Sequence, residues 1–246
     1  MGDALIPSLK RALEGRVYPS ADVISILRVI GKADRGAVEN LLKQHLNHPD
    51  ANIRTQVFRS LGTVHFRPNH EERAHIAEMI REEVGHGLRV LKAQRVMTDD
   101  LALAPLRRAL GFEVSMRQDR IFLLLAFLHD AETVVRSRFR LIHGDRNEGA
   151  IALESLDLML RGTREGVAYV LIDPRESLEN RIEKLDQVCC TPTLGRDACL
   201  LEIGFDTKTT WVREWTRSWA IYGAWHLDLV KDATALHAHL NDSSPL

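Results

Sequence analysis

The sequence predicts an all-α protein made of antiparallel helix pairs, and three observations lead to this fold class. Residues 120–160 contain three helix-length amphipathic segments joined by two very short breaks, so consecutive segments must stack antiparallel. Two further segments, 37–46 and 53–64, are separated by a His-Pro-Asp turn, in which Pro49 ends one helix and Asp50 caps the next. Other prolines also stand where a helix should stop, namely Pro19, Pro68, Pro174 and Pro192.

The individual helices follow from apolar residues that recur every three to four positions between such breaks. The last of the three adjoining segments, for example, crowds Leu153, Leu156 and Leu160 on one side, while Ala150 and Ala152 let a neighbour approach. In chain order we expect helices near 3–14, 20–31, 36–47, 51–64, 70–97, 101–112, 116–129, 131–142, 147–161, 164–172, 177–189, 194–203, 207–225 and 228–240.

Paired in order, these helices give six or seven units with a period of about 40 residues, which is typical of helical repeat arrays. No single pair can bury its apolar face alone, so neighbours must stack. The expected product is a curved right-handed α-α superhelix with an extended concave surface. Because no long linker divides the array, residues 1–246 are predicted to form one solenoid.

The pair that contains the His-Pro-Asp turn resembles a HEAT repeat. In that family, helix A is followed by a short turn with Pro and Asp, and helix B opens with an aliphatic and a basic residue, here Ile53 and Arg54. The sequence departs from the family at His48, where an acidic residue is usual, and at Gly149, where the later repeat would carry an Arg. The resemblance implies a HEAT-like solenoid of the armadillo type.

From about Pro19 to Ala224, the order of segments resembles the HEAT region attached to bacterial transporter-like proteins of the ATP/ADP translocase and major-facilitator type. The most specific pieces are RIFxLL followed by Phe127 and Leu128, ALExLDxxL in 152–160, and WxRxxAxY in 215–222. The sequence departs at Trp219, where a small residue is usual, and no transporter helices or nucleotide-binding domain accompany the array. The resemblance implies a soluble scaffold, either a module of a membrane transporter-like protein or its partner.

Length and charge limit the classes of protein to which the chain can belong. With 246 residues and 45% hydrophobic content, the chain can bury a large core. Its 33 basic and 34 acidic residues give a net charge of −1, so no global attraction to nucleic acid or anionic lipid is expected. The longest apolar run, 121–128, is far below the roughly 20 residues of a membrane-spanning helix, and the N-terminus does not fit a secretory signal. Membrane insertion by this chain is therefore not expected.

The three cysteines are an odd number in a chain with no sign of secretion, so reduced thiols and a cytoplasmic location are expected. If the transporter resemblance reflects descent, a partner or a fused domain would hold the chain at the cytoplasmic face of the inner membrane. Cys189 and Cys190 are adjacent but lack the spacing of a metal or redox site, so they are expected to be small buried residues at a helix end.

Five aromatic residues cluster in the expected helix 207–225, three of them at intervals of four on one side: Trp211, Trp215, Trp219, Tyr222 and Trp225. One interpretation makes them a stacking platform for bases or an anchor for a partner helix, with Trp211 and Trp215 as candidate binding residues. The other, which we favour, is that the large rings close the open end of the last repeat. Two nearby arginines, Arg213 and Arg217, are too few to follow a phosphate backbone.

Arginine is also enriched in the middle third of the chain. Guanidinium groups on a concave surface would favour acidic peptides, phosphates or carboxylates through bidentate contacts. The alternative, which has the greater weight, is that neighbouring Glu side chains neutralise them as solvated pairs. Arg54, Arg89 and Arg95 are the first candidates for contact with a partner.

No catalytic constellation is found. Phosphate-binding glycine loops, the zinc-protease motif and the serine-hydrolase elbow are all absent. Glu154 and Asp157 lie three apart on one helix, but Glu154 is expected to cap or bond a neighbouring turn and Asp157 to face an adjacent loop, rather than to act as acid and base. The histidines are spaced too far apart or lie on different faces for a metal site. No catalytic residue, metal or cofactor is predicted, and the sequence does not decide whether a small molecule binds.

The sequence therefore predicts a non-enzymatic HEAT-like scaffold for protein–protein interaction, with a protein as its partner and not nucleic acid. The alternative is a DNA-binding enzyme of the alkylpurine glycosylase type, a HEAT-like group of similar length that uses Trp, Asp and Arg on a concave surface. A near-neutral chain is poorly suited to clamp a duplex. The HEAT-like bilin lyases are a further enzymatic relative, but they would need a partner chain.

Overall fold

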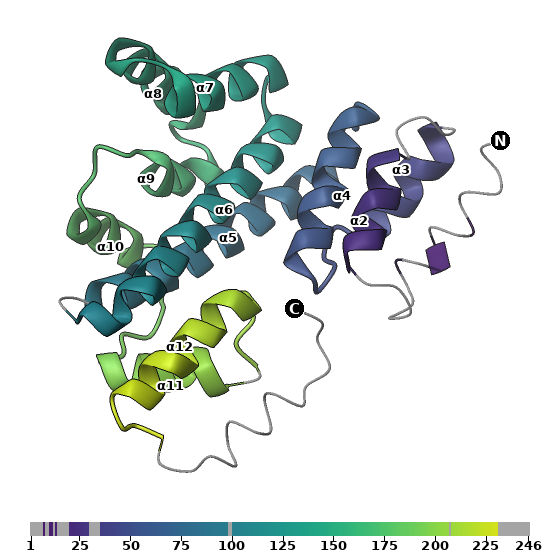
Figure 1. The fold of residues 1–246 in the computed structure, drawn as a ribbon. Coiled ribbons are helices and arrows are strands. Elements are labelled where there is room, and N and C mark those ends of the chain that lie inside the picture. Colours follow the sequence, from purple (N-terminus) through teal and green to yellow (C-terminus); the bar gives the residue numbers. More distant parts are fainter. Residues whose placement is uncertain are drawn as a thin grey trace. The chain divides into compact units, whose positions relative to one another are not determined.

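The computed structural model describes residues 20–29, 35–97, 100–206 and 208–230, together with four isolated helical positions before them, Pro7, Lys10, Arg11 and Leu13. Over these residues the chain is all-helical and has no strand, which confirms the predicted class (Figure 1). The helices are α2 (Ser20–Val29), α3 (Arg35–Gln44), α4 (Ala51–Thr63), α5 (His70–Val96), η2 (Leu101–Leu103), α6 (Ala104–Leu128), α7 (Ala131–His143), α8 (Arg146–Leu160), η3 (Arg164–Val167), α9 (Ala168–Ile172), α10 (Leu178–Asp186), α11 (Arg196–Phe205) and α12 (Glu214–His226).

Helix α5 has nearly the predicted bounds, but the prediction of two helices at 101–112 and 116–129 is wrong. A single helix, α6, spans 25 residues there. Gly111 weakens a helix by only about 1 kcal/mol relative to Ala, and buried residues continue on one side across it, including Leu110, Val114 and Ile121. The apolar face therefore keeps the helix unbroken.

The C-terminal predictions also need correction. The expected helix 207–225 begins only at Glu214, and residues 208–213 are not helical. Of the expected helix 228–240, residues 228–230 are not helical and the remainder lies outside the described residues. Most of the expected helix 3–14 also lies outside them.

The chain divides into two compact units. Unit 1 consists of Met1–Arg81 and Asp119–Gly166, and unit 2 consists of Glu82–Gln118 and Val167–Leu246. Helices α5 and α6 each contribute to both units. The organisation as one solenoid over residues 1–246, and its superhelical path, stay predictions.

In unit 1, aspartates cap the helices as the sequence suggests. The Asp50 carboxylate accepts hydrogen bonds from Asn52 N and Ile53 N, at 2.7 and 3.2 Å, and so starts α4. Asp145 starts α8 with a reciprocal capping box that involves Glu148. Helices α2 and α3 both pack against α4.

Helices α7 and α8 form a hairpin and are the last two α-helices of unit 1 in chain order. They pack on each other, and α8 buries Ala152, Leu153, Leu156 and Leu160, as predicted. The outer side of α7 is also apolar but exposed. Three residues spaced four and three apart form this exposed α7 stripe, namely Val135, Phe139 and Ile142.

In unit 2, a glycine allows α9 to approach α5 closely. A Cβ atom on Gly87 would lie 2.6 Å from Leu171 Cδ2, so only glycine fits there without a shift. Helix α10 packs on α9, and α11 packs on α12, which also contacts η2 (Figure 1).

Candidate interaction surface

The loop that leads into α12 is fixed to the rest of unit 2 by a buried tryptophan and a buried arginine. Trp211 is only 3% exposed. Its carbonyl accepts a hydrogen bond from Arg117 Nη2 at 2.5 Å, and its indole Nε1 donates to Glu202 Oε1 at 3.4 Å. Arg117 in turn pairs with Glu83 at 2.8 Å, with both side chains buried. The chain therefore enters α12 from a fixed position.

A second buried charge, Glu113, caps the start of α12 from another helix. Its carboxylate is 1% exposed, and Oε1 accepts hydrogen bonds from Arg213 N at 3.0 Å, Arg213 Nε at 3.2 Å and Thr216 Oγ1 at 2.7 Å. Arg213 itself occupies the N-cap position of α12 but makes no side-chain cap. Glu113 thus supplies the missing acceptor, and its negative charge is favourable at a helix N-terminus.

The inner side of α12 is built from small residues, so the helix can pack closely. Thr216, Ala220, Gly223 and Ala224 are buried. A Cβ atom on Gly223 would lie 2.6 Å from Leu103 Cδ2 and 3.3 Å from Leu200 Cδ2, which leaves no room for a side chain. Packing on α11 and η2 therefore fixes the rotation of α12 about its own axis.

The outer side of α12 carries the aromatic row, which consists of Trp215, Trp219, Tyr222 and His226. Neighbouring rings touch along the helix. The centroids of Trp215 and Trp219 are 5.5 Å apart at 90°, those of Trp219 and Tyr222 are 5.8 Å apart at 86°, and Tyr222 stacks on His226 at 6.1 Å. Edge-to-face pairs at these distances are favourable for aromatic rings. The aromatic row is therefore an ordered ridge.

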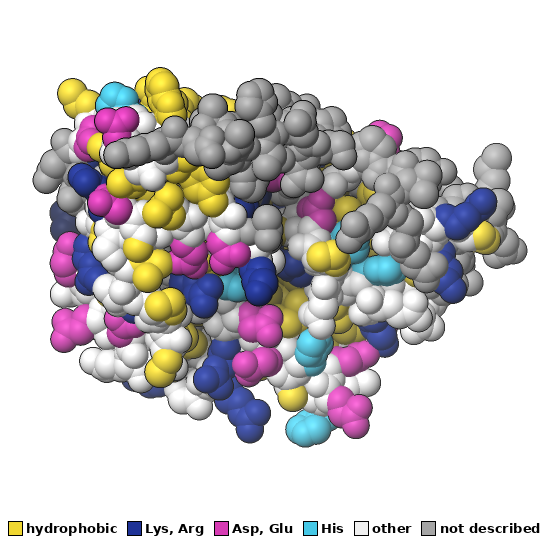
Figure 2. Space-filling model, turned by 90° about the horizontal axis from the view of Figure 1, so that it is seen from below, with side chains coloured by type: hydrophobic (Ala, Val, Ile, Leu, Met, Phe, Trp, Pro, Cys, Tyr) yellow, Lys and Arg dark blue, Asp and Glu magenta, His cyan; other side chains and the backbone are white. Residues whose placement is uncertain are grey.

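Much of this ridge is open to solvent. Trp215 is 62% exposed, Tyr222 is 42% exposed, and Trp225, which lies beside the aromatic row, is 57% exposed. Figure 2 shows one face of the molecule, on which hydrophobic side chains are exposed among charged side chains of both signs.

The aromatic row contains no acidic or basic residue of the Asp, Glu, Lys or Arg type. The two arginines nearest to it in sequence are held by other groups. Arg217 donates to the carbonyls of Asp206 and Thr209 at 3.0 and 2.8 Å. Arg213 binds Glu113, and its guanidinium lies 4.5 Å from the centroid of the Phe112 ring. The ridge is therefore aromatic and lacks Asp, Glu, Lys and Arg.

The structure corrects the preferred sequence interpretation of the tryptophans. Trp211 and Trp215 do not share one helix face, because α12 begins after Trp211. Trp211 is a core residue, as the closure of the repeat would require, whereas Trp215, Tyr222 and Trp225 point outward. Large rings on α12 thus do not seal the core, since small residues do so.

The three candidate arginines have different surroundings. Arg54, in unit 1, donates to the carbonyl of His48 at 2.6 Å and so closes the turn between α3 and α4. In unit 2, Arg95 is half-buried in the last turn of α5. Arg89, also half-buried, lines a small cavity to which Trp211 contributes. Of the five predicted partner-binding residues, only Arg89 and Trp211 are thus brought to one site.

That cavity is too small for an organic ligand. Its volume is about 20 Å³, which is room for roughly one water molecule. Lys92 at its wall is held by Asp186 at 2.6 Å and by the carbonyl of Thr191 at 2.8 Å. Burial raises the pKa of the Cys199 thiol to about 12, with a smaller contribution from Glu202, so the thiol stays protonated at neutral pH. The cavity offers no activated nucleophile from this cysteine.

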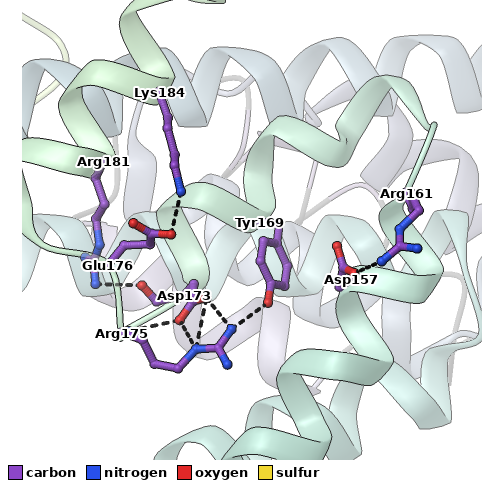
Figure 3. A network of polar contacts seen from close by, with 8 residues as sticks. All are labelled: Asp157, Arg161, Tyr169, Asp173, Arg175, Glu176, Arg181 and Lys184. Atoms are coloured by element: carbon purple, nitrogen blue, oxygen red, sulfur yellow. Dashed lines mark hydrogen bonds and ion pairs between the residues drawn. The ribbon is translucent and has the colours of Figure 1, made fainter.

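A polar cluster follows α9 (Figure 3). Arg175 binds both carboxylate oxygens of Asp173, with Nη2 at 2.7 Å and Nε at 2.9 and 3.2 Å, and also contacts the hydroxyl of Tyr169 at 3.1 Å. Arg181 donates to the carbonyl of Asp173 at 2.8 Å, and Lys184 pairs with Glu176. Each of the three cations thus has a protein partner, and the cluster holds the loop between α9 and α10.

From the sequence, Asp157 is expected to face an adjacent loop rather than to act with Glu154 as a catalytic pair. Asp157 forms an exposed ion pair with Arg161 one turn later on α8. No three His, Cys, Asp or Glu side chains converge on a metal-sized site in the part of the chain that the structure describes.

Of the two adjacent cysteines, Cys190 is exposed and Cys189 is half-buried, so the prediction of two buried residues is wrong. The reason is that α10 ends at Asp186, which places both thiols in the following loop. No helix within the described ranges combines the length and the apolar character needed to cross a bilayer.

Two residues of this surface escaped sequence reasoning. His226 completes the aromatic row, and steps of four, three and four residues from Trp215 onward could have revealed it. Glu113 gave no signal, because it precedes Thr216 by 103 residues.

Comparisons of the chain with protein-family models, with curated protein sequences and with solved structures gave no match.

Proposed function

We propose that this chain is a HEAT-like, non-enzymatic scaffold of the cytoplasm that binds another polypeptide through the aromatic row of α12. The observation that carries the proposal is the contrast between the two sides of this helix. Small residues, Glu113 and Arg117 fix one side and the preceding loop, while large rings stand exposed on the other. Tryptophan and tyrosine dominate the binding energy of protein interfaces when they are exposed in the free protein and buried in the complex.

The rigidity of the ridge supports this function. The rings already contact one another, and α12 is held at its start, along its inner side and through Arg217. A surface that is ordered before binding loses little conformational entropy on association. Exposed aromatic side chains without such support would be weaker anchors.

The charges around the ridge favour a protein over nucleic acid. A stacking platform for single strands needs cations that follow the phosphate backbone, and a glycosylase must hold a charged duplex. Here Arg213 and Arg217, the arginines nearest the row in sequence, are bound to Glu113 and to main-chain carbonyls. The soluble module of a transporter-like assembly, which the sequence resemblance implies, is compatible with a protein partner.

A photo-crosslinking side chain at Ser218 tests this proposal. Ser218 is exposed and lies three residues after Trp215 and four before Tyr222, hence beside the aromatic row. In cells that naturally make the protein, we expect a crosslinked adduct with a polypeptide, which Trp215→Ala abolishes. The matched control places the same group at Glu183, an exposed position on α10. Equal adducts at both positions, or an adduct that ignores Trp215→Ala, would refute the proposal.

A further inference from the structure

We infer that the aromatic row binds a second copy of this chain, with the two α12 helices antiparallel about a two-fold axis. The inference rests on the proposed function, because it takes the same ridge as the interaction surface and identifies the polypeptide that covers it.

The spacing of the row is the same in both directions along the helix. From Trp215 to His226 the steps are four, three and four residues. A two-fold axis through the middle therefore places Trp215 opposite His226 of the second copy, and Trp219 opposite Tyr222 of the second copy. Alternating steps of three and four also keep the contact seam of two packed helices continuous. Two-fold interfaces require such a self-complementary surface.

The lack of Asp, Glu, Lys and Arg in the aromatic row also favours a second copy of the chain as the partner. A charged ridge would repel a second copy of itself, because like charges facing one another destabilise an interface. This ridge has no Asp, Glu, Lys or Arg, and the adjacent Arg217 is held by main-chain carbonyls. Glu214 flanks one end only, so antiparallel pairing keeps the two Glu214 side chains at opposite ends of the contact. The opposite polarity of the two helices is also electrostatically favourable.

The exposed area indicates how stable the pair is. If an aromatic side chain offers roughly 150–250 Å², the exposed parts of Trp215, Tyr222 and Trp225 amount to about 240–400 Å² per copy. Stable complexes bury about 800 Å² per partner. The ridge alone therefore predicts a reversible, concentration-dependent dimer, which an additional contact or another protein could strengthen or replace.

Sedimentation velocity of the full chain tests for this dimer. Between about 5 and 500 µM protein, which spans weak association, we expect the sedimentation coefficient to rise toward that of a dimer. Trp215→Ala should weaken self-association by about 30-fold, as expected for an interface hot spot. Phe139→Ala is the matched control, because Phe139 is an aromatic residue of the exposed α7 stripe and is 63% exposed. It should leave the dimer unchanged.

A charge exchange tests the antiparallel arrangement. Trp215→Glu should abolish the dimer. Adding His226→Lys to that variant should recover part of the lost association, because each new carboxylate then meets a new ammonium group on the second copy. The two positions are eleven residues apart in one helix, too far to pair within a chain. Trp215, His226 and the control residue Phe139 are all exposed. Circular dichroism checks that the variants stay folded.

Three results would overturn the inference: a single monomeric species at every concentration, a dimer that tolerates Trp215→Ala, or one that Phe139→Ala weakens equally. Failure to recover any of the lost association in the double variant would overturn the antiparallel arrangement. The outcome for the proposed function can be distinguished from the outcome for the dimer. A monomer in sedimentation together with a Trp215-dependent adduct to a different protein would leave that function intact and remove only the self-pairing.

Discussion

Glu113 and Thr216 lie 103 residues apart in sequence, and their side chains meet in the core, where Thr216 Oγ1 donates to Glu113 Oε1 at 2.7 Å. The same carboxylate oxygen accepts Arg213 N and Nε. One buried acid of α6 therefore joins the start of α12 to the body of unit 2. This contact sets the position from which the aromatic row is presented.

Replacing Glu113 should destabilise the protein strongly. Glu113→Ala leaves two donors of Arg213 and the Thr216 hydroxyl without an acceptor, and removing one partner of a buried charged group costs about 3–5 kcal/mol. Glu113→Gln keeps one acceptor oxygen, and the expected loss is about 1–2 kcal/mol. Urea unfolding gives both values. As a control, Glu183→Ala on exposed α10 should change stability by less than about 0.5 kcal/mol, and an equal loss in Glu113→Ala and this control would contradict the assigned role.

The two tryptophans on either side of the α12 boundary should respond in opposite ways. Trp211 is buried and holds two hydrogen bonds, so Trp211→Ala should cost about 3–5 kcal/mol of stability. Trp215→Ala removes a largely exposed ring from a helix surface and should cost no more than about 1 kcal/mol. Thermal unfolding at low protein concentration, where self-association does not contribute, measures both. A large loss from Trp215→Ala would mean that the ridge belongs to the core.

Trp211 and Trp215 also show which features of the site could be predicted from the sequence and which could not. Periodicity placed Trp211 and Trp215 on one helix, since four residues separate them as on a helix face. The structure breaks that pattern because Trp211 is held by Arg117 and Glu202, which a local pattern cannot reveal. The all-helical class followed from apolar spacing and proline breaks, which are local properties.

Helix lengths were predictable only where the breaking residue was strong. Asp50 marks a real helix start, and its cap is confirmed, whereas α3 already ends at Gln44, before Pro49. The break expected between residues 112 and 116 does not occur, because buried residues on both sides of it keep α6 continuous. The candidate site was predictable only in part. The spacing of the aromatic residues singled out Trp215, but whether it lies in the core or on the surface depends on which face of α12 carries residues small enough to pack closely.

Two glycines in helices should give opposite results when replaced by alanine. At Gly223 the new Cβ would lie 2.6 Å from Leu103 Cδ2, and overpacking of this kind costs about 1–3 kcal/mol. A Cβ atom added at Gly149 on α8 would have no atom within 4 Å apart from the neighbouring backbone of its own helix. Gly149→Ala should therefore stabilise the protein by about 0.5–1 kcal/mol through helix propensity. Chemical unfolding separates the two. If Gly223→Ala were stabilising too, α12 would not pack as closely on η2 as the structure shows.

The cysteines should differ in reactivity. Cys199 is buried, and burial raises the pKa of its thiol to about 12, so almost no thiolate exists at pH 8. Cys190 is exposed in the loop after α10. An aromatic disulfide reagent should therefore label Cys190 in the native protein and reach Cys199 only after unfolding. Peptide mapping by mass spectrometry identifies the labelled thiol, and rapid native labelling of Cys199 would contradict its burial.

Asp173 should make the stability depend on pH. Its burial raises the pKa of the carboxyl, but hydrogen bonds from Arg175 outweigh that effect, so the net pKa lies below the usual value (Figure 3). A depressed pKa in the folded state contributes stability above about pH 4, and this contribution is lost as the pH falls through the folded-state pKa. Asp173→Asn keeps one acceptor oxygen for the bonds from Arg175 N and Nε, but it loses the negative charge and the second oxygen, which accepts from Arg175 Nη2.

We therefore expect Asp173→Asn to lose about 1–2 kcal/mol at pH 7, a value kept low because the Arg175 side chain is largely exposed. The difference from the unchanged protein should shrink below about pH 4, where the carboxyl of the unfolded state becomes protonated, and vanish once the pH falls below the lowered pKa of the folded state. Urea unfolding across pH 3.5 to 7 measures this difference, with Asp157→Asn as the control. Asp157 forms an exposed pair with Arg161, so its loss should stay within about 0.5 kcal/mol throughout. If the Asp173→Asn difference did not change with pH, the ion pair would not be its cause.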